Sequence, residues 1–114
     1  MRMLLLASFL IAGLIAGCTD PAEPPAAPTN LTVMALGAGA HLTWVDNSDN
    51  ELEFAIQRMQ VGSEPAMREL ARVPFDGTQY HDEPIVPGAT YQYEVIATND
   101  GGDAASNLVT FVAP

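Results

Sequence analysis

The sequence contains no lysine, and only four arginines stand against its 14 aspartates and glutamates, which gives a formal net charge of −10 at pH 7. Proteins that bind nucleic acid gain affinity by neutralising phosphates with basic side chains, so this composition excludes a nucleic-acid partner. The single cysteine, Cys18, leaves no pair for a disulfide within the chain, and packing alone must hold the fold together. After residue 30 no stretch shows sustained helical periodicity, which disfavours a helical fold.

A short apolar stretch opens the chain. Residues 3–15 are apolar apart from Ser8 and Gly13, and Arg2 places one positive charge before them. A transmembrane helix needs about 20 apolar residues, so this stretch is too short to span a bilayer and is typical of a secretory signal peptide. We therefore assign residues 1–17 to a signal peptide.

Small residues and the only cysteine close that stretch. Residues 14–18, Leu-Ile-Ala-Gly-Cys, resemble the lipobox that a bacterial lipoprotein signal peptidase cuts. The resemblance implies cleavage between Gly17 and Cys18, and attachment of lipid to Cys18. Bacterial lipoproteins carry several acyl chains on this residue, as a stable membrane anchor requires. A buried, inert thiol is the alternative interpretation of a lone cysteine.

The resemblance also implies a location. A bacterial lipoprotein works outside the cytoplasm, held to a membrane by the lipid on its first mature residue. Thr19 follows the cysteine, whereas an aspartate at that position favours retention at the inner membrane in some bacteria. The outer membrane or the cell surface is therefore the favoured location.

Residues 18–28 form a segment rich in proline and alanine. Such a segment cannot build a core, and it favours an extended polyproline conformation of about 3.1 Å per residue. A disordered linker is the alternative. Under both interpretations the segment is a tether that lifts the following domain, residues 29–114, off the membrane.

The remaining chain alternates apolar and polar residues in short runs separated by glycine, proline, asparagine or aspartate. Seven strands are expected, at residues 31–35, 41–45, 53–57, 68–73, 78–82, 90–98 and 108–112. Residues 99–103 are expected to form a turn. About seven antiparallel strands with such breaks predict an all-β, immunoglobulin-like sandwich.

The pattern resembles a known family. Trp44 on the second strand, Phe54-Ala-Ile56 on the third and the run at residues 85–99, with its Pro-Gly turn and alternating Tyr91 and Tyr93, resemble a fibronectin type III domain. The resemblance implies a tyrosine corner at Tyr91, whose hydroxyl bonds the backbone a few residues upstream. It also implies that Trp44 fills the centre of the core. The expected core side chains are Trp44, Phe54, Ile56, Tyr91, Tyr93 and Val95.

Groups that could perform catalysis are sparse. His41 and His81 are expected on the surface of strands, and no serine lies in a nucleophile-elbow context. No glycine-rich loop opens a helix, so a phosphate cradle is absent from the sequence. We therefore expect neither an enzyme nor a cofactor.

Acidic residues gather in the loops that this fold would place at one end, beside the tether. Carboxylates are the ligands that calcium prefers, so these loops suggest a calcium site as an alternative, and a contact with a basic partner surface as another. The segment at residues 46–51 lacks the glycine turn and the distal glutamate of a calcium loop. Turn-forming, solubilising residues are therefore the main interpretation, and no metal is predicted. The residues of the alternative site are Asp46, Asp49, Glu51, Asp100 and Asp103.

Taken together, the sequence predicts a non-catalytic, membrane-anchored lipoprotein that displays an interaction module to an envelope or extracellular protein. An accessory carbohydrate-associated module is the alternative. Sugar binding needs exposed aromatic side chains, and the core assignment leaves only Phe75, Tyr80 and Phe111 for that role.

Overall fold

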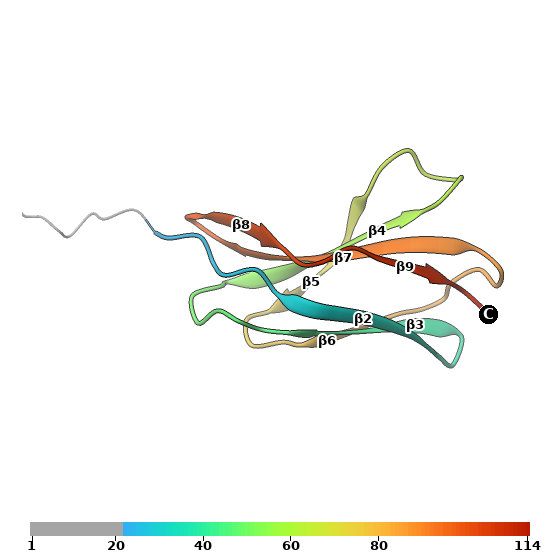
Figure 1. Cartoon of the computed structure of the whole chain (residues 1–114), viewed down its shortest axis with the longest axis horizontal. Coiled ribbons are helices and arrows are strands. Elements are labelled where there is room, and N and C mark those ends of the chain that lie inside the picture. Colours follow the sequence, from blue (N-terminus) through green and yellow to red (C-terminus); the bar gives the residue numbers. More distant parts are fainter. Residues whose placement is uncertain (1–21) are drawn as a thin grey trace, which may run out of the picture.

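The computed structural model describes residues 22–114, so the expected cleavage site and the lipidation site at Cys18 lie outside the described residues. The strands are β2 (Thr29–Leu36), β3 (Gly39–Val45), β4 (Glu53–Gln60), β5 (Arg68–Pro74), β6 (Gln79–Asp82), β7 (Thr90–Asn99), β8 (Gly102–Ala105) and β9 (Val109–Val112). They form two antiparallel sheets that face each other (Figure 1). One sheet has the order β2-β3-β6, the other β5-β4-β7-β8, and β9 also pairs with β7. Within this part of the chain no helix is long and apolar enough to cross a bilayer.

The predicted all-β sandwich is confirmed, with one correction to its strands. Residues 102 and 103 were expected in a turn, but they begin β8, and Asn99 pairs with Gly102 across a tight reversal. Gly102 has a φ of 144°, a conformation that other residues rarely adopt, so the reversal depends on glycine. The edge of the sheet beside β7 is therefore formed by two short strands, β8 and β9.

The interruption between β8 and β9 connects the two sheets. Ser106 Oγ accepts a hydrogen bond from the backbone N–H of Val95 at 2.9 Å. The Asn107 side chain bonds both backbone groups of Leu31 in β2, accepting at 3.0 Å and donating at 3.1 Å. These bonds satisfy buried backbone groups where the strand pairing is broken.

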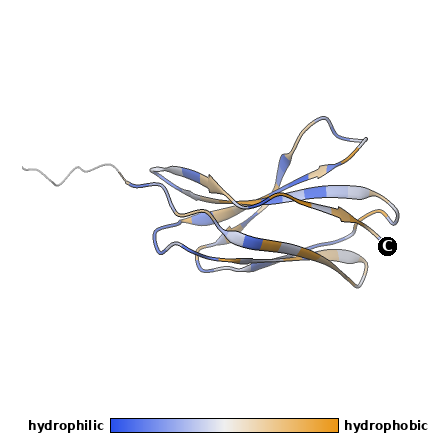
Figure 2. Cartoon of the chain, viewed as in Figure 1, coloured by the Kyte–Doolittle hydropathy of each residue, from blue (hydrophilic) through white to orange (hydrophobic). Residues whose placement is uncertain are grey.

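The core lies between the sheets and is built from one face of each strand. Hydrophilic residues are interspersed with hydrophobic ones along the strands (Figure 2), as period-two alternation requires. Trp44 packs against Phe54 with ring centroids 5.5 Å apart, and Tyr91 lies 6.1 Å from Tyr93. The structure buries all six expected core side chains: Trp44, Phe54, Ile56, Tyr91, Tyr93 and Val95.

The tyrosine at the start of β7 has the contact that the family resemblance implies. Tyr91 Oη accepts a hydrogen bond from the backbone N–H of Val86 at 2.8 Å, five residues upstream. The ring itself is buried in the core. The hydroxyl therefore fixes the loop between β6 and β7 to the edge of the core.

A buried polar network joins the sheets beside these tyrosines. Asp82 on β6 accepts hydrogen bonds from Arg58 Nη1 at 3.0 Å and from Tyr93 Oη at 2.6 Å. Burial and the hydrogen bond to Asp82 raise the pKa of Tyr93 above its usual value. Burial lowers the pKa of Arg58, but the hydrogen bond and the charge of Asp82 outweigh this and raise it. The Arg58 guanidinium also lies 5.3 Å from the centre of the Tyr91 ring, within the range of a cation–π contact.

The segment that precedes β2 packs against the sandwich. Pro25 and Pro28 are buried, although both fall in the expected tether of residues 18–28. A β-carbon on Gly101 would lie 2.2 Å from the carbonyl oxygen of Ala22, so the chain passes very close to the β7–β8 turn. The packed unit thus includes residues upstream of the expected start at residue 29.

Asparagine side chains hold this segment in place. Asn99 and Asn50 both donate to the carbonyl oxygen of Glu23, at 2.8 and 3.1 Å. Asn47 donates to the carbonyl oxygen of Ala27 at 3.0 Å. Residues 22–28 are therefore fixed to the loops at one end of the sandwich (Figure 1).

Candidate functional site

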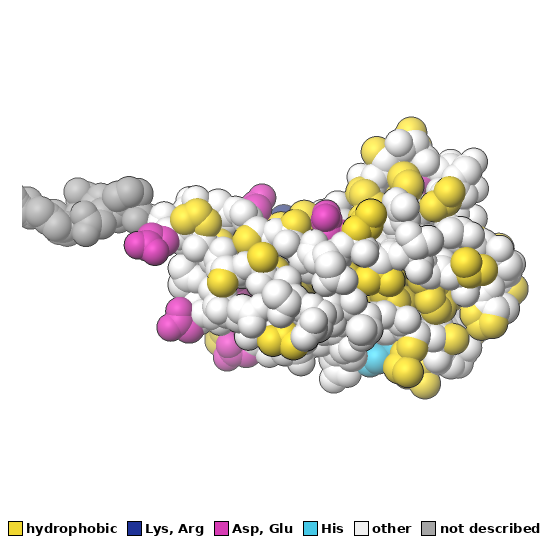
Figure 3. All heavy atoms as spheres, in the orientation of Figure 1, with side chains coloured by type: hydrophobic (Ala, Val, Ile, Leu, Met, Phe, Trp, Pro, Cys, Tyr) yellow, Lys and Arg dark blue, Asp and Glu magenta, His cyan; other side chains and the backbone are white. Residues whose placement is uncertain are grey.

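The sandwich has two chemically different ends. The acidic pole comprises the loops at residues 46–52, 75–78 and 100–101, beside the point where the chain enters. The distal pole comprises residues 37–38, 61–67, 83–89 and 113–114. Figure 3 shows acidic side chains mostly near the entering chain and hydrophobic atoms more densely at the other end. Each pole is a candidate surface for recognition.

Three carboxylates meet at the acidic pole. Asp46 and Glu51 come from the β3–β4 loop and Asp76 from the β5–β6 loop, and their ligand oxygens all lie within 4.8 Å of one another. Asp46 Oδ1 accepts from the backbone N–H of Ser48 at 3.0 Å, which fixes its orientation. Glu51 is 6% exposed, and its Oε2 accepts from the backbone N–H of Asp76 at 3.1 Å.

This group differs from the alternative calcium site that the sequence suggests. The structure brings Asp46 and Glu51 together, but their third partner is Asp76. Asp49, Asp100 and Asp103 do not belong to the group. Asp100 and Asp103 instead line a groove on the outer face of the five-stranded sheet. The fold brings the β3–β4 and β5–β6 loops together, and the cluster therefore joins residues that are distant in the sequence.

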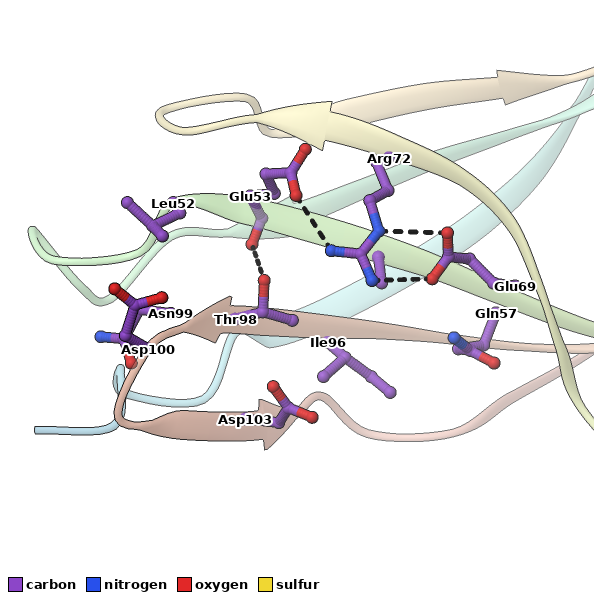
Figure 4. A pocket seen from close by; sticks show the side chains of 11 residues that line it. Leu52, Glu53, Gln57, Glu69, Arg72, Ile96, Thr98, Asn99, Asp100 and Asp103 are labelled. Carbon is purple, nitrogen blue, oxygen red and sulfur yellow. Dashed lines mark hydrogen bonds and ion pairs between the residues drawn. The ribbon is translucent and has the colours of Figure 1, made fainter. Parts of the chain in front are cut away.

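That outer groove has a volume of about 490 Å³ and a paired arginine at its centre (Figure 4). Arg72 donates to Glu69 at 2.9 Å and to Glu53 at 2.9 Å. The hydrogen bonds raise the pKa of Arg72, and the bond from Arg72 lowers the pKa of Glu69. Because the arginine is already satisfied, the groove presents mainly acidic and neutral polar groups to a ligand.

The distal pole carries exposed apolar side chains and little charge. Val61 and Val86 in its loops, and Leu36 and Val112 at the adjoining strand ends, are between 45% and 61% exposed. A hollow of about 180 Å³, lined by glycine, alanine, proline and isoleucine residues, lies between the β2–β3 turn and the chain end. Its loops hold two carboxylates, Glu64 and Glu83, bonded to Arg68 and His81 respectively. This pole therefore favours an apolar contact.

The two histidines lie together on the outer face of the three-stranded sheet. His41 Nδ1 is 3.4 Å from His81 Nδ1, and His41 Nε2 is 3.1 Å from Gln79 Oε1. His81 Nε2 is 2.7 Å from Glu83 Oε1. The hydroxyls of two serines have other partners: Ser48 bonds Asn50, and Ser106 bonds the backbone. The histidines, Gln79 and Glu83 thus form a polar surface cluster.

The three aromatic residues considered for sugar binding differ in how exposed they are. Phe75 is 63% exposed at the acidic pole. Tyr80 and Phe111 are partly buried and pack against the core. A flat stacking platform for a sugar needs more exposed aromatic area than Phe75 offers.

Comparisons with known proteins concern the fold. No model of a protein family matches the sequence, and no curated protein matches it. Among solved structures, a myokine is 26% identical with a TM-score of 0.65, covering 79% of this chain and 98% of its own.

Two human domains are also similar in structure. The sixth fibronectin type III domain of human fibronectin type III domain containing protein 3 is 24% identical, with a TM-score of 0.61, and the match covers 87% of this chain and 91% of that one. The fibronectin type III domain of human collagen XX is 16% identical, with a TM-score of 0.64, and covers 85% and 100% of the two chains. The chain therefore has the fold of a single fibronectin type III domain.

Proposed function

We propose that this protein is a non-catalytic, membrane-anchored lipoprotein that displays one fibronectin type III module for contact with another envelope or extracellular protein. The observation that carries the proposal is the difference in charge between the two poles. The chain enters at the acidic pole, where asparagines hold residues 22–28, while the opposite pole has exposed aliphatic side chains and only two carboxylates, both paired.

The anchor would sit on the side of the acidic pole. Lipid on Cys18 would be four residues from Ala22, the first described residue, which contacts Gly101 at this pole. Carboxylates near an anionic membrane surface are repelled by it, so the module would stand off the bilayer rather than lie on it. The distal pole would then face outward.

The distal pole is the favoured contact surface for a protein partner. Its exposed apolar side chains can be desolvated at little cost, and its two carboxylates are already paired. Protein interfaces have a desolvated apolar centre with a polar rim, and the distal pole has that composition. A carbohydrate-associated role lacks such support, because only Phe75 among the candidate aromatics is well exposed.

Cross-linking in intact cells tests the contact surface. A photoreactive residue is placed at Ser63 in the distal pole and, separately, at Asp103 beside the acidic pole, since both positions are exposed. We expect one abundant protein adduct from Ser63 and none from Asp103. An adduct from Asp103 alone would assign the contact to the acidic pole. The absence of a protein adduct from both positions would refute the proposed interaction role.

The anchor is tested by Cys18→Ser. Because the chain has no other cysteine, thioether-linked lipid has a single possible position. We expect the wild-type protein to incorporate radiolabelled fatty acid and to sediment with membranes, and the variant to do neither. A variant that still sediments with membranes would refute anchoring through Cys18.

A further inference from the structure

The strongest unexplained feature of the described residues is a buried carboxylate oxygen at the acidic pole. Glu51 Oε1 is shielded from solvent and has no hydrogen-bond partner. The side chain as a whole is 6% exposed. A buried polar atom without a partner is costly, and more so when it belongs to a charged group. Something other than a protein donor is therefore needed to satisfy this oxygen.

Two further carboxylates lie beside Glu51 and add negative charge around it. Oxygens of Asp46 and Asp76 lie within 4.8 Å of a Glu51 carboxylate oxygen, so three carboxylates converge from two loops. Like charges at such a separation repel one another, and one of the three, Glu51, is buried. A cation held between the three carboxylates would relieve that repulsion.

No arginine in the described part of the chain supplies that cation. Residues 22–114 contain three arginines, and each has carboxylate partners elsewhere. Arg58 pairs with Asp82, Arg68 with Glu64, and Arg72 with Glu53 and Glu69. The sequence contains no lysine. A bound metal cation is therefore a candidate for the counter-charge.

We propose that Asp46, Glu51 and Asp76 bind a calcium ion that links the β3–β4 loop to the β5–β6 loop. Calcium takes oxygen ligands at roughly 2.3–2.6 Å, so two oxygens on opposite sides of one ion lie about 5 Å apart. The spacing of the three carboxylate oxygens, all within 4.8 Å, meets that condition. Magnesium demands near-ideal octahedral geometry and gives up its waters reluctantly, whereas calcium accepts irregular coordination, which makes calcium the better match for carboxylates from two loops. Water completes the coordination shell, which requires about six to eight oxygens.

Calorimetry and thermal unfolding of the purified full chain in detergent test the site, with calcium chloride as the probe. At a calcium concentration about tenfold above Kd, we expect the Tm to rise by about 5–10 °C relative to buffer with a chelator. Amide hydrogens at residues 46–52 and 75–78 should exchange more slowly with calcium than without it. Sodium chloride of equal ionic strength should do neither.

Matched variants separate binding from a general effect of charge. Asp76→Asn removes one ligand charge at an exposed position, and Asp49→Asn makes the same change in the β3–β4 loop outside the cluster. We expect Asp76→Asn to weaken calcium binding at least tenfold and Asp49→Asn to change it less than twofold. Equal losses in the two variants would refute a defined site, as would the absence of calcium-dependent heat in the wild type. An equal Tm rise with magnesium chloride would overturn the assignment to calcium.

Glu51→Gln gives a second and independent readout. The amide keeps an acceptor for the Asp76 N–H but removes the buried charge. Without calcium we expect this variant to melt at or above the Tm of the wild type, and calcium should no longer raise its Tm. A variant that melts below the wild type in chelator would show that the carboxylate stabilises the fold by itself, and would overturn the proposal.

Discussion

The acidic pole and the distal pole are made from the same kind of element, a set of loops joining antiparallel strands, but they differ in how their carboxylates are partnered. At the acidic pole, Asp46, Glu51 and Asp76 crowd together without a basic partner. At the distal pole, Glu64 and Glu83 are each paired, and the exposed side chains are aliphatic. The comparison teaches that the strands set the positions of the loops while the loop residues set the chemistry.

The two halves of the core differ in a related way. Near the acidic pole the sheets are held by apolar packing, with Trp44 against Phe54. Near the distal pole they are held by a buried polar network in which Asp82 receives hydrogen bonds from Arg58 and Tyr93. The part of the core next to the acidic pole is thus apolar, and the part next to the distal pole contains the Asp82 network. Perturbing each half separately shows how far the two ends of the domain depend on each other.

The largest expected effect comes from Trp44→Ala at the acidic end of the core. Removing a buried tryptophan costs about 3–5 kcal/mol through lost burial and the cavity left behind. A domain of this size has roughly 5–10 kcal/mol of stability, so most of it would be lost. Urea unfolding of the two proteins measures the loss, and Phe75→Ala, which truncates an exposed aromatic, should change it little. An unchanged Tm in Trp44→Ala would contradict the core assignment.

A somewhat smaller effect is expected from Asp82→Asn at the distal end. The substitution leaves Arg58, whose side chain is 14% exposed, without a counter-charge. Removing one partner of a buried ion pair costs about 3–5 kcal/mol, and we expect about 2–3 kcal/mol because asparagine keeps one acceptor for Tyr93. The exposed pair gives the matched control, since Glu69→Gln beside Arg72 breaks a solvent-screened ion pair and should cost much less. Equal losses in the two variants, measured by urea unfolding, would show that burial does not matter.

The same network predicts an alkaline dependence of stability. The pKa of Tyr93 is raised by burial and by Asp82, so the folded protein holds the phenolic proton more tightly than the unfolded chain does. Stability from this group is complete below the unfolded pKa of about 10 and is lost as the pH rises above it. Urea unfolding between about pH 8 and pH 11 should show a steeper decline in the wild type than in Tyr93→Phe. Parallel curves would contradict the proposed cause.

The strand positions and the core could be predicted from the sequence because alternation directly encodes which side chains face inward. In β7, buried Tyr91, Tyr93 and Val95 alternate with half-buried residues, as a strand with one face in the core requires. β8 was missed because its sequence, Gly-Asp-Ala-Ala, has neither alternation nor β-branched residues. Only its pairing with β7 makes it a strand.

The candidate site was less predictable because its contacts join distant positions. Asp76 meets Glu51 across 25 residues, and nothing in the local sequence distinguishes it from Asp49. Asn99 bonds the carbonyl of Glu23 across 76 residues, whereas its local sequence suggests only a turn. Asp82 is buried in the core, although a carboxylate at the end of a short strand is usually exposed. Such partners follow from the tertiary fold and not from local pattern.

The smallest expected effect on stability comes from Gly101→Ala, which perturbs the acidic pole and leaves the distal pole unchanged. Gly101→Ala places a methyl group where the carbonyl oxygen of Ala22 would lie 2.2 Å away, a distance that backbone atoms cannot accept. The segment at residues 22–28 must then move, and the bonds from Asn50 and Asn99 to Glu23 would be broken. We expect changed NMR signals from the Asn47 and Asn50 side-chain amides, which donate to this segment, and a loss of about 1 kcal/mol or less in the free energy of unfolding, because the strands are untouched.

A glycine at the opposite pole provides the control for that experiment. Gly62 has a φ of 85°, and a β-carbon there meets no atom within 4 Å. Gly62→Ala should therefore cost about 1–2 kcal/mol through backbone strain alone and leave the Asn47 and Asn50 side-chain signals unchanged. Only Gly101→Ala would alter the entering segment, because Gly62 lies at the opposite pole. Unchanged Asn47 and Asn50 signals in Gly101→Ala would mean that these side chains do not hold the entering chain, and the orientation inferred for the module would lose its basis.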